Sequence, residues 1–123
     1  MRGAVDPPTL FESARERLMP LVLAHGFRPG ALEYEGGHAF AEYWRSGIRL
    51  RLVWEGNERA LWVDSAPESG AQVVGRWQDI EWQAAGERLP LDRDQTEARV
   101  ERLVQAVERW LAGASAPRGP GGR

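Results

Sequence analysis

Alternation of apolar and polar residues across residues 38–65 is the feature that most constrains how this chain can fold. The stretches HAFAEYW, IRLRLVWE and ERALWVDS each follow the period of two that is typical of a strand with one buried face. Ser46-Gly47 separates the first two stretches and Gly56-Asn57 separates the second two, and both pairs suit two-residue hairpin turns. The pattern therefore predicts three consecutive antiparallel strands.

Two-residue turns would also fix which residues lie opposite one another in this sheet. The first turn places Tyr43 opposite Leu50, and the second places Leu52 opposite Leu61. One face of the sheet is then apolar and is expected to form the core, with the side chains of Ala41, Tyr43, Ile48, Leu50, Leu52, Leu61 and Val63.

The second face of the predicted sheet alternates arginine with aromatic and acidic residues. The same register forms three cross-strand rows, which are Trp44–Arg49–Asp64, Glu42–Arg51–Trp62 and Phe40–Val53–Ala60. Charge pairing and cation–π contacts within a row contribute up to about 1 kcal/mol, which stabilises a register but does not explain two tryptophans facing water.

Three interpretations of this second face stay open. It can be a self-satisfied surface in which arginine stems cover the indoles, or the segment around residues 77–82 can fold over it. It can also be a binding face, because tryptophan and arginine are enriched at interface hot spots. The candidate binding face consists of Phe40, Glu42, Trp44, Arg49, Arg51, Trp62 and Asp64.

Amphipathic helices are predicted on either side of the strands. Thr9-x-x-Glu12 predicts a capping box at the start of the first helix, Gly26 its end, and Pro20 a kink or division. Asp94-x-x-Glu97 predicts the start of the last helix, whose apolar stripe ends at Gly113 and whose charged face is expected to be solvated surface.

These elements predict an α+β fold: an antiparallel sheet of three or four strands with the N- and C-terminal helices packed on one face. A short strand over residues 31–35 supplies the fourth, and residues 76–86 favour a short helix closed by Gly86 over a strand. We expect a flexible arm at 1–8, a single domain at 9–112 and a disordered tail at 113–123.

Composition excludes several classes of chemistry. The chain has no cysteine, two histidines and a net charge of −2, so we expect no metal, no cofactor and no general attraction to nucleic acid. Glu42 and Asp64 would also repel phosphate from the candidate binding face. No apolar run reaches the roughly 20 residues needed to span a bilayer, which predicts a cytoplasmic protein with no membrane contact.

A catalytic set has little support in the spacing. His38 with Glu42, Asp64 or Glu81 is the best general acid–base set available, but His38 follows Gly36-Gly37 and is expected at a turn. A small enzyme or small-molecule binder, with a site between the sheet and the 67–91 segment, remains the alternative. A deep pocket holding His38 or Glu81 would favour that alternative, and a flat aromatic face would favour protein binding.

The segments LAHGFR, GIRLRLVWEGNERALWVD, WQDIEWQAAGERLPLD and RVERLVQAVERWL together resemble a group of small uncharacterised bacterial helix–sheet–helix proteins, over residues 9–111. The resemblance implies a fold and transfers no functional residue. Some bacterial proteins of similar build are immunity or accessory proteins. The leading hypothesis is therefore a non-enzymatic module that binds another protein, or a second copy of itself, through the candidate binding face.

Overall fold

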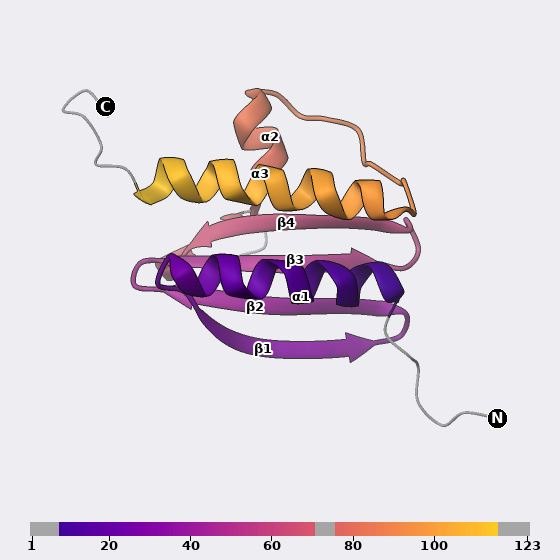
Figure 1. Cartoon of the computed structure of the whole chain (residues 1–123), viewed down its shortest axis with the longest axis horizontal. Coiled ribbons are helices and arrows are strands. Elements are labelled where there is room, and N and C mark those ends of the chain that lie inside the picture. Colours follow the sequence, from indigo (N-terminus) through magenta and orange to yellow (C-terminus); the bar gives the residue numbers. More distant parts are fainter. Residues whose placement is uncertain (1–7, 71–75, 116–123) are drawn as a thin grey trace.

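The computed structural model of the chain describes residues 8–70 and 76–115 as two layers, a sheet and a pair of helices (Figure 1). Helices α1 and α3 lie side by side over one face of the sheet, and the short helix α2 lies beyond α3. In chain order the elements are α1 (Thr9–Ala24), β1 (Arg28–Glu35), β2 (His38–Arg45), β3 (Ile48–Glu55), β4 (Ala60–Pro67), the 3₁₀ turn η1 (Glu68–Gly70), β5 (Gln78–Asp79), α2 (Ile80–Ala85) and α3 (Glu97–Ser115).

The sheet is antiparallel and has five strands in the order β1-β2-β3-β4-β5. The α+β class is confirmed, but the predicted count of three or four strands is too low. The added strand is β5, whose two residues, Gln78 and Asp79, pair with the end of β4. A strand this short leaves no period-two pattern in the sequence. Of the 76–86 segment, only the helix and its closing residue could therefore be predicted, and Gly86 does close α2, with φ 77°.

The predicted register is right between β2 and β3 and wrong between β3 and β4. Tyr43 lies opposite Leu50 as expected. Leu52, however, lies opposite Val63 instead of Leu61, because the β3–β4 loop has four residues, Gly56 to Arg59, in place of two. A slip of two residues keeps every side chain on its predicted face, since the side-chain period of a strand is two.

Strand β1 is exposed along its whole length and contains an irregularity. Its pairing with β2 shifts between Pro29 and Leu32, so that two residues of β1 lie opposite Glu42 alone. This is a β-bulge, which bends the strand and increases its twist. Gly36-Gly37 then forms the two-residue turn into β2, with both glycines at positive φ.

Helix α1 ends at Ala24, and Gly26, the predicted stop, adopts the left-handed φ of 86° just beyond it. The N–H of Phe27 donates to the carbonyl of Val22, and that of Gly26 donates to Leu23, which is the paired arrangement of a Schellman motif. Val22 and Phe27 are both buried, so this end of the helix is anchored in the core.

The start of α1 differs from the predicted capping box. Pro8 occupies the N-cap position and no side chain caps the helix. The Glu12 carboxylate instead accepts a hydrogen bond from the Tyr34 hydroxyl at 2.5 Å and from Arg15 at 2.8 Å. The contact with Tyr34 of β1 therefore uses the Glu12 carboxylate that the predicted capping box requires. Further along, α1 continues through Pro20 without the predicted division.

Helix α3 begins and ends later than predicted, at Glu97 and Ser115. The Asp94 carboxylate accepts from the N–H and the hydroxyl of Thr96, so it stabilises the turn that precedes the helix. The predicted tail therefore starts with helical residues 113–115. Its remainder, and the predicted arm except for Pro8, lie outside the described residues.

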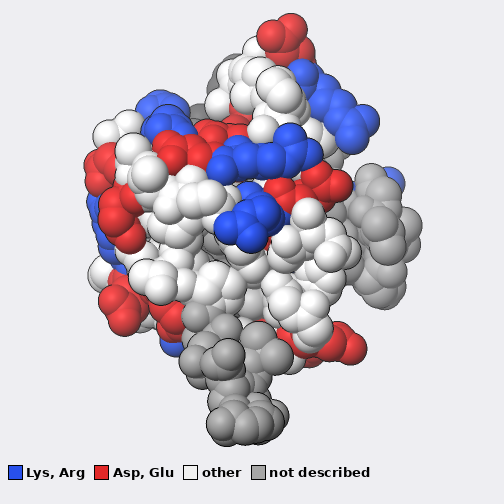
Figure 2. All heavy atoms as spheres, turned by 90° about the vertical axis from the view of Figure 1, so that its right-hand side faces the viewer, with Lys and Arg blue, Asp and Glu red and all other residues white. Residues whose placement is uncertain are grey.

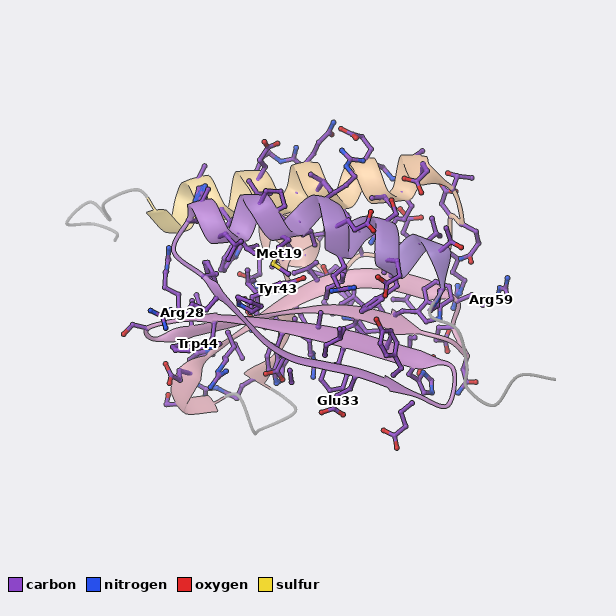
Figure 3. All side chains as sticks on the ribbon, turned by 60° about the horizontal axis from the view of Figure 1, so that its bottom comes forward. Met19, Arg28, Glu33, Tyr43, Trp44 and Arg59 are labelled. Atoms are coloured by element: carbon purple, nitrogen blue, oxygen red, sulfur yellow. The ribbon has the colours of Figure 1, made fainter. Side chains whose placement is uncertain are left out.

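The core lies between the two helices and the apolar face of the sheet. Figure 3 shows Met19 of α1 and Tyr43 of β2 in this layer. The buried side chains include Phe11, Leu18, Leu50, Leu52, Leu61, Val63, Leu103 and Leu111. Burial also raises the pKa of the Tyr43 hydroxyl to about 12.

Candidate functional site

The outer face of the sheet, on the side away from α1 and α3, carries the candidate binding residues. Figure 3 shows Trp44 on this side together with Arg28 and Glu33 of β1. Of the seven predicted residues, only Asp64 is buried, and the other six are partly exposed. The structure therefore brings all seven together on one face, although in different rows from those predicted.

Trp44 is held by arginines from both neighbouring strands. Arg28 of β1 and Arg49 of β3 lie directly opposite it, with their guanidinium carbons 5.8 and 5.7 Å from the indole centroid. Arg49 also lies 3.9 Å from the Glu42 carboxylate. Cation–π contacts at such distances orient an indole and reduce its freedom to rotate.

Arg51 forms the centre of the next row, between Glu42 and Asp64 instead of between Glu42 and Trp62. Its guanidinium donates two hydrogen bonds to Asp64, at 3.1 and 2.9 Å, in a bidentate pair. Trp77 stacks on the same guanidinium, with 4.1 Å between the guanidinium carbon and the indole centroid. The interpretation in which the segment around residues 77–82 folds over this face is thus correct for one part of it, because Trp77, just before α2, covers its β4 side.

The third row is apolar and crosses three strands. Phe40, Val53 and Trp62 lie opposite one another on β2, β3 and β4, and all three are partly exposed. The predicted third member, Ala60, is displaced by the two-residue slip and lies opposite Glu55. The charged row of Glu42, Arg51 and Asp64 lies on one side of this apolar row, and the polar ends of the strands, with His38 and Glu55, lie on the other. An apolar centre with polar surroundings is typical of an interface.

A cleft lies between β4, α2 and the loop that follows α2. Two adjoining cavities of about 450 and 360 Å³ share six lining residues, Trp62, Asp79, Trp82, Leu89, Pro90 and Leu91. The larger is also lined by Asp64, Trp77 and Arg88. We call this region the tryptophan cleft, after Trp62, Trp77 and Trp82, and it lies where the alternative hypothesis placed a site.

Asp79 is the partly buried acid of the tryptophan cleft. One oxygen, Oδ1, accepts hydrogen bonds from the backbone N–H groups of Glu81 and Trp82, and so caps α2. Burial raises the pKa of the Asp79 carboxyl to about 6, and the neighbouring Glu81 carboxylate adds to the shift. The two backbone donors and Arg99 act against it.

Arg99 is buried where the sequence predicted solvated surface, with only 2% of its area exposed. It forms a bidentate pair with Glu81, at 2.9 and 2.8 Å, and its Nε donates to the carbonyl of Leu61 at 3.2 Å. It thus joins α3 to α2 and to the part of β4 that β5 does not reach. Its position one turn before Leu103, on the apolar stripe, is the signal available in the sequence.

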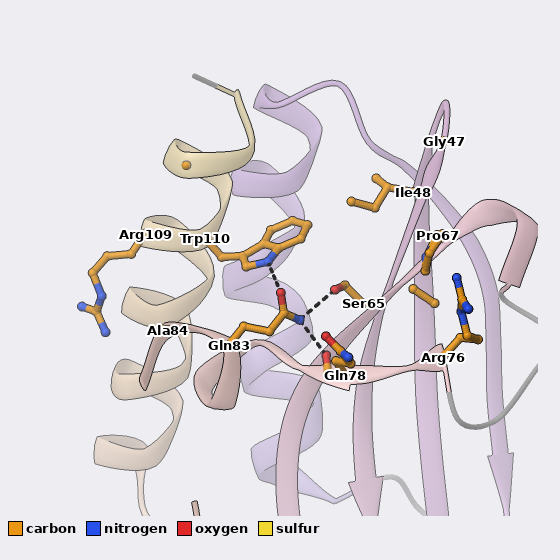
Figure 4. A pocket seen from close by; sticks show the side chains of 12 residues that line it. Gly47, Ile48, Ser65, Pro67, Arg76, Gln78, Gln83, Ala84, Arg109 and Trp110 are labelled. Atoms are coloured by element: carbon orange, nitrogen blue, oxygen red, sulfur yellow. Dashed lines mark hydrogen bonds between the residues drawn. The ribbon is translucent and has the colours of Figure 1, made fainter. Parts of the chain in front are cut away.

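A larger groove, of about 1010 Å³, lies where β4, α2 and the end of α3 meet (Figure 4). Gln83 is at its centre. Its amide nitrogen donates to the Ser65 hydroxyl and to the Gln78 carbonyl, and its amide oxygen accepts from the Trp110 indole. These polar groups are hydrogen-bonded to one another, so the Gln83 side chain links α2 to β4, β5 and α3.

His38 is a structural residue of the hairpin ends. Its Nδ1 accepts a hydrogen bond from the N–H of Gly56 at 3.1 Å and lies 3.0 Å from the Glu55 carboxylate. It lines none of the three cavities described above. Glu81 does line the tryptophan cleft, but Arg99 occupies both of its oxygens. The contacts of His38 are with Gly56 and Glu55, so the general acid–base set considered from the sequence, His38 with Glu42, Asp64 or Glu81, is not assembled.

Surface charges on the described part of the chain are mixed in sign. Figure 2 shows acidic and basic side chains interleaved at the end where the helices begin. Ion pairs there include Arg93 with Glu58 and Arg102 with both Asp92 and Asp94. Within residues 8–70 and 76–115, no group of three or more His, Cys, Asp or Glu is placed to hold a metal ion. No helix in these ranges is long and apolar enough to cross a membrane.

Comparisons of the chain with protein-family models, curated proteins and solved structures found no match. The resemblance to small bacterial helix–sheet–helix proteins therefore stays a prediction.

The raised pKa of Asp79 predicts a stability that falls as pH rises. Between about pH 4 and 6 the unfolded chain loses the Asp79 proton while the folded protein retains it, so the free energy of unfolding decreases over this window. Because Asp79 is partly exposed, we discount the effect of the pKa shift and expect the free energy of unfolding to fall by about 1–2 kcal/mol. Urea unfolding of the wild type and of Asp79→Asn, at pH 4, 5, 6 and 7, measures it.

Asparagine caps a helix as well as aspartate does, so Asp79→Asn removes the titrating charge and keeps α2. The variant should gain stability relative to the wild type as pH rises through this window, whereas the exposed control Glu87→Gln should show a flat difference. The groups facing Asp79 are Asp64 of β4, Glu81 of α2 and Arg99 of α3. If the stability difference between Asp79→Asn and the wild type is independent of pH, or changes in the opposite direction, the raised pKa of Asp79 is wrong.

Proposed function

We propose that this chain is a non-enzymatic, cytoplasmic protein-binding module whose partner docks on the outer face of the sheet. The observation that carries the proposal is the partly exposed apolar row of Phe40, Val53 and Trp62, on a sheet whose other face holds both long helices. A sheet face that is neither covered by a layer nor fully polar is typical of an interaction surface.

The charged rows support docking because they are already paired. Arg51 is committed to Asp64 and Arg49 lies near Glu42, so a partner that covers these rows buries paired charges instead of isolated ones. Trp44 is oriented by Arg28 and Arg49 before any partner arrives. Preorganised tryptophan and arginine side chains lose little conformational entropy on binding.

The partner class follows from this mixed surface. Paired acids and arginines lie beside the apolar row, so the complementary surface is another protein with an apolar region next to charges of both signs, or a second copy of this chain. An immunity-like or accessory protein is the corresponding biological role. The interleaved acids of the face argue against nucleic acid as the partner.

The test is the double variant Phe40→Ser/Trp44→Ser, compared with Leu23→Ser. Trp62 is left intact because it also lines the tryptophan cleft. Leu23 is 48% exposed on α1, so its variant removes an exposed apolar side chain from the helix layer. A partner captured by the wild type is identified by mass spectrometry and purified, and its Kd is measured with each variant.

We expect the double variant to weaken binding by about 100-fold, corresponding to roughly 2.7 kcal/mol for two hot-spot residues. Leu23→Ser should change the Kd less than about twofold. If the partner is a second copy, sedimentation velocity should show a wild-type dimer and a folded, monomeric double variant. Unchanged partner affinity and unchanged oligomeric state in the folded double variant would overturn the proposal.

A further inference from the structure

The tryptophan cleft combines aromatic walls with a carboxylate that lacks a dedicated cation. Three indoles line its larger cavity, and Asp64 and Asp79 lie opposite one another across the β4–β5 pair. The Asp64 carboxylate is already neutralised by Arg51 and also accepts from the Trp62 indole at 3.2 Å. Asp79 forms no ion pair within the described residues, so its charge is free to interact with a ligand.

Arg88 shows that this cleft attracts a cation. Its guanidinium carbon lies 4.7 Å from the Trp82 centroid, although the side chain is on an exposed loop and forms no ion pair in the described part of the chain. The Trp82 indole is thus already in contact with one cationic group, and a cationic ligand at this indole would take the place of Arg88. Tryptophan is the strongest of the aromatic side chains in this type of contact.

Hydrogen-bond acceptors are scarce in the tryptophan cleft. Both oxygens of Asp64 are used by Arg51, and Oδ1 of Asp79 is used by the cap of α2. The Glu81 oxygens are used by Arg99. A cation that needs several acceptors is therefore poorly served, whereas a methylated ammonium group, which needs none, can rely on indole faces and on the Asp79 charge.

We propose that the tryptophan cleft is a binding site for a small quaternary ammonium compound. The carboxylate of Asp79 supplies the counter-charge and the indoles of Trp62, Trp77 and Trp82 supply the walls. A cavity of about 450 Å³ is large enough for such a ligand. The inference does not rest on the proposed function, because its charged residue and two of its three indoles lie outside the candidate binding face.

Choline is the probe, and 3,3-dimethyl-1-butanol is its neutral counterpart of nearly the same shape. The six tryptophan indole N–H signals of the ¹⁵N-labelled protein are assigned and followed during each titration. We expect saturable shifts at Trp62, Trp77 and Trp82, and not at Trp44, Trp54 or Trp110. Choline should bind about 10-fold more tightly than the neutral compound, since one cation–π site with a counter-charge supplies at least that factor.

Asp79→Asn should weaken choline binding about 10-fold while retaining the helix cap, and the matched charge variant Glu87→Gln should leave it within about twofold. The indole spectrum without ligand confirms that both variants are folded. Equal affinity for the two compounds, equal shifts at Trp44 and Trp110, or unchanged affinity in Asp79→Asn would each overturn the inference. None of these outcomes depends on the Phe40→Ser/Trp44→Ser experiment.

Discussion

Replacing Arg99 with alanine is expected to lower the free energy of unfolding by about 3–5 kcal/mol, because it leaves a partly buried carboxylate and a strand carbonyl without their donor. In the folded protein, Arg99 donates two hydrogen bonds to the Glu81 carboxylate and two to the Leu61 carbonyl. A domain of this size has a total stability of about 5–15 kcal/mol, so the loss would remove a large part of it. Urea unfolding followed by circular dichroism measures the change.

Arg102→Ala is the matched control, one turn further along α3. Arg102 pairs with Asp92 and Asp94, but its side chain is 46% exposed, compared with 2% for Arg99. Exposed pairs contribute about 0–1 kcal/mol, so the two alanine variants should differ several-fold in their cost. A double-mutant cycle of Arg99→Ala with Glu81→Ala should show a coupling energy of about 2 kcal/mol or more. Equal costs for Arg99→Ala and Arg102→Ala would mean that Arg99 does not stabilise the contacts of α3 with α2 and β4.

Gly56→Ala is the second substitution expected to have a large effect, with a loss of about 2–3 kcal/mol. A Cβ atom at Gly56 would lie 2.4 Å from the carbonyl oxygen of Gly37 and 3.0 Å from its carbonyl carbon. These are backbone atoms of the neighbouring hairpin, so they cannot rotate away as a side chain could. The same shift would disturb the hydrogen bond from the Gly56 N–H to His38.

Gly113→Ala is the control, and it is expected to change stability in the opposite direction. Gly113 lies in α3, where an added Cβ atom would meet no neighbouring element within 4 Å, so alanine should stabilise the helix by about 0.5–1 kcal/mol. Thermal unfolding of both variants beside the wild type separates the two effects. A Gly56→Ala protein as stable as the wild type would show that the two hairpin ends move apart without cost.

Gly56 also explains why the predicted β3–β4 register is wrong. Glycine followed by asparagine is a strong signal for a two-residue turn, but Gly56 is required for its close approach to Gly37, and Arg59 adopts the positive φ of 53° that ends a four-residue loop. The glycine at position 56 is therefore visible in the sequence. The reason for it is a contact between two hairpins, which no local sequence pattern predicts.

The same division between local and tertiary causes applies to the helices and the candidate site. The period-two and helical patterns are sufficient to predict the faces of β2, β3 and β4 and the apolar stripe of α3. They are not sufficient for Glu12, whose carboxylate is bonded to Tyr34 of β1, or for Arg99, which is buried by α2 and β4. The tryptophan cleft likewise depends on where the loop after α2 returns to the sheet.

The bulge in β1 limits how copies of this protein can assemble. At one border of the sheet, Pro29 lacks an N–H group and the bulge interrupts the regular spacing of the others. At the opposite border, β5 pairs with Asp64 and Ser65 of β4, and the Arg99 side chain donates to the carbonyl of Leu61. Among residues 8–70 and 76–115, neither border offers a long continuous template for strand addition, so growth of the sheet by edge-to-edge pairing of chains is disfavoured.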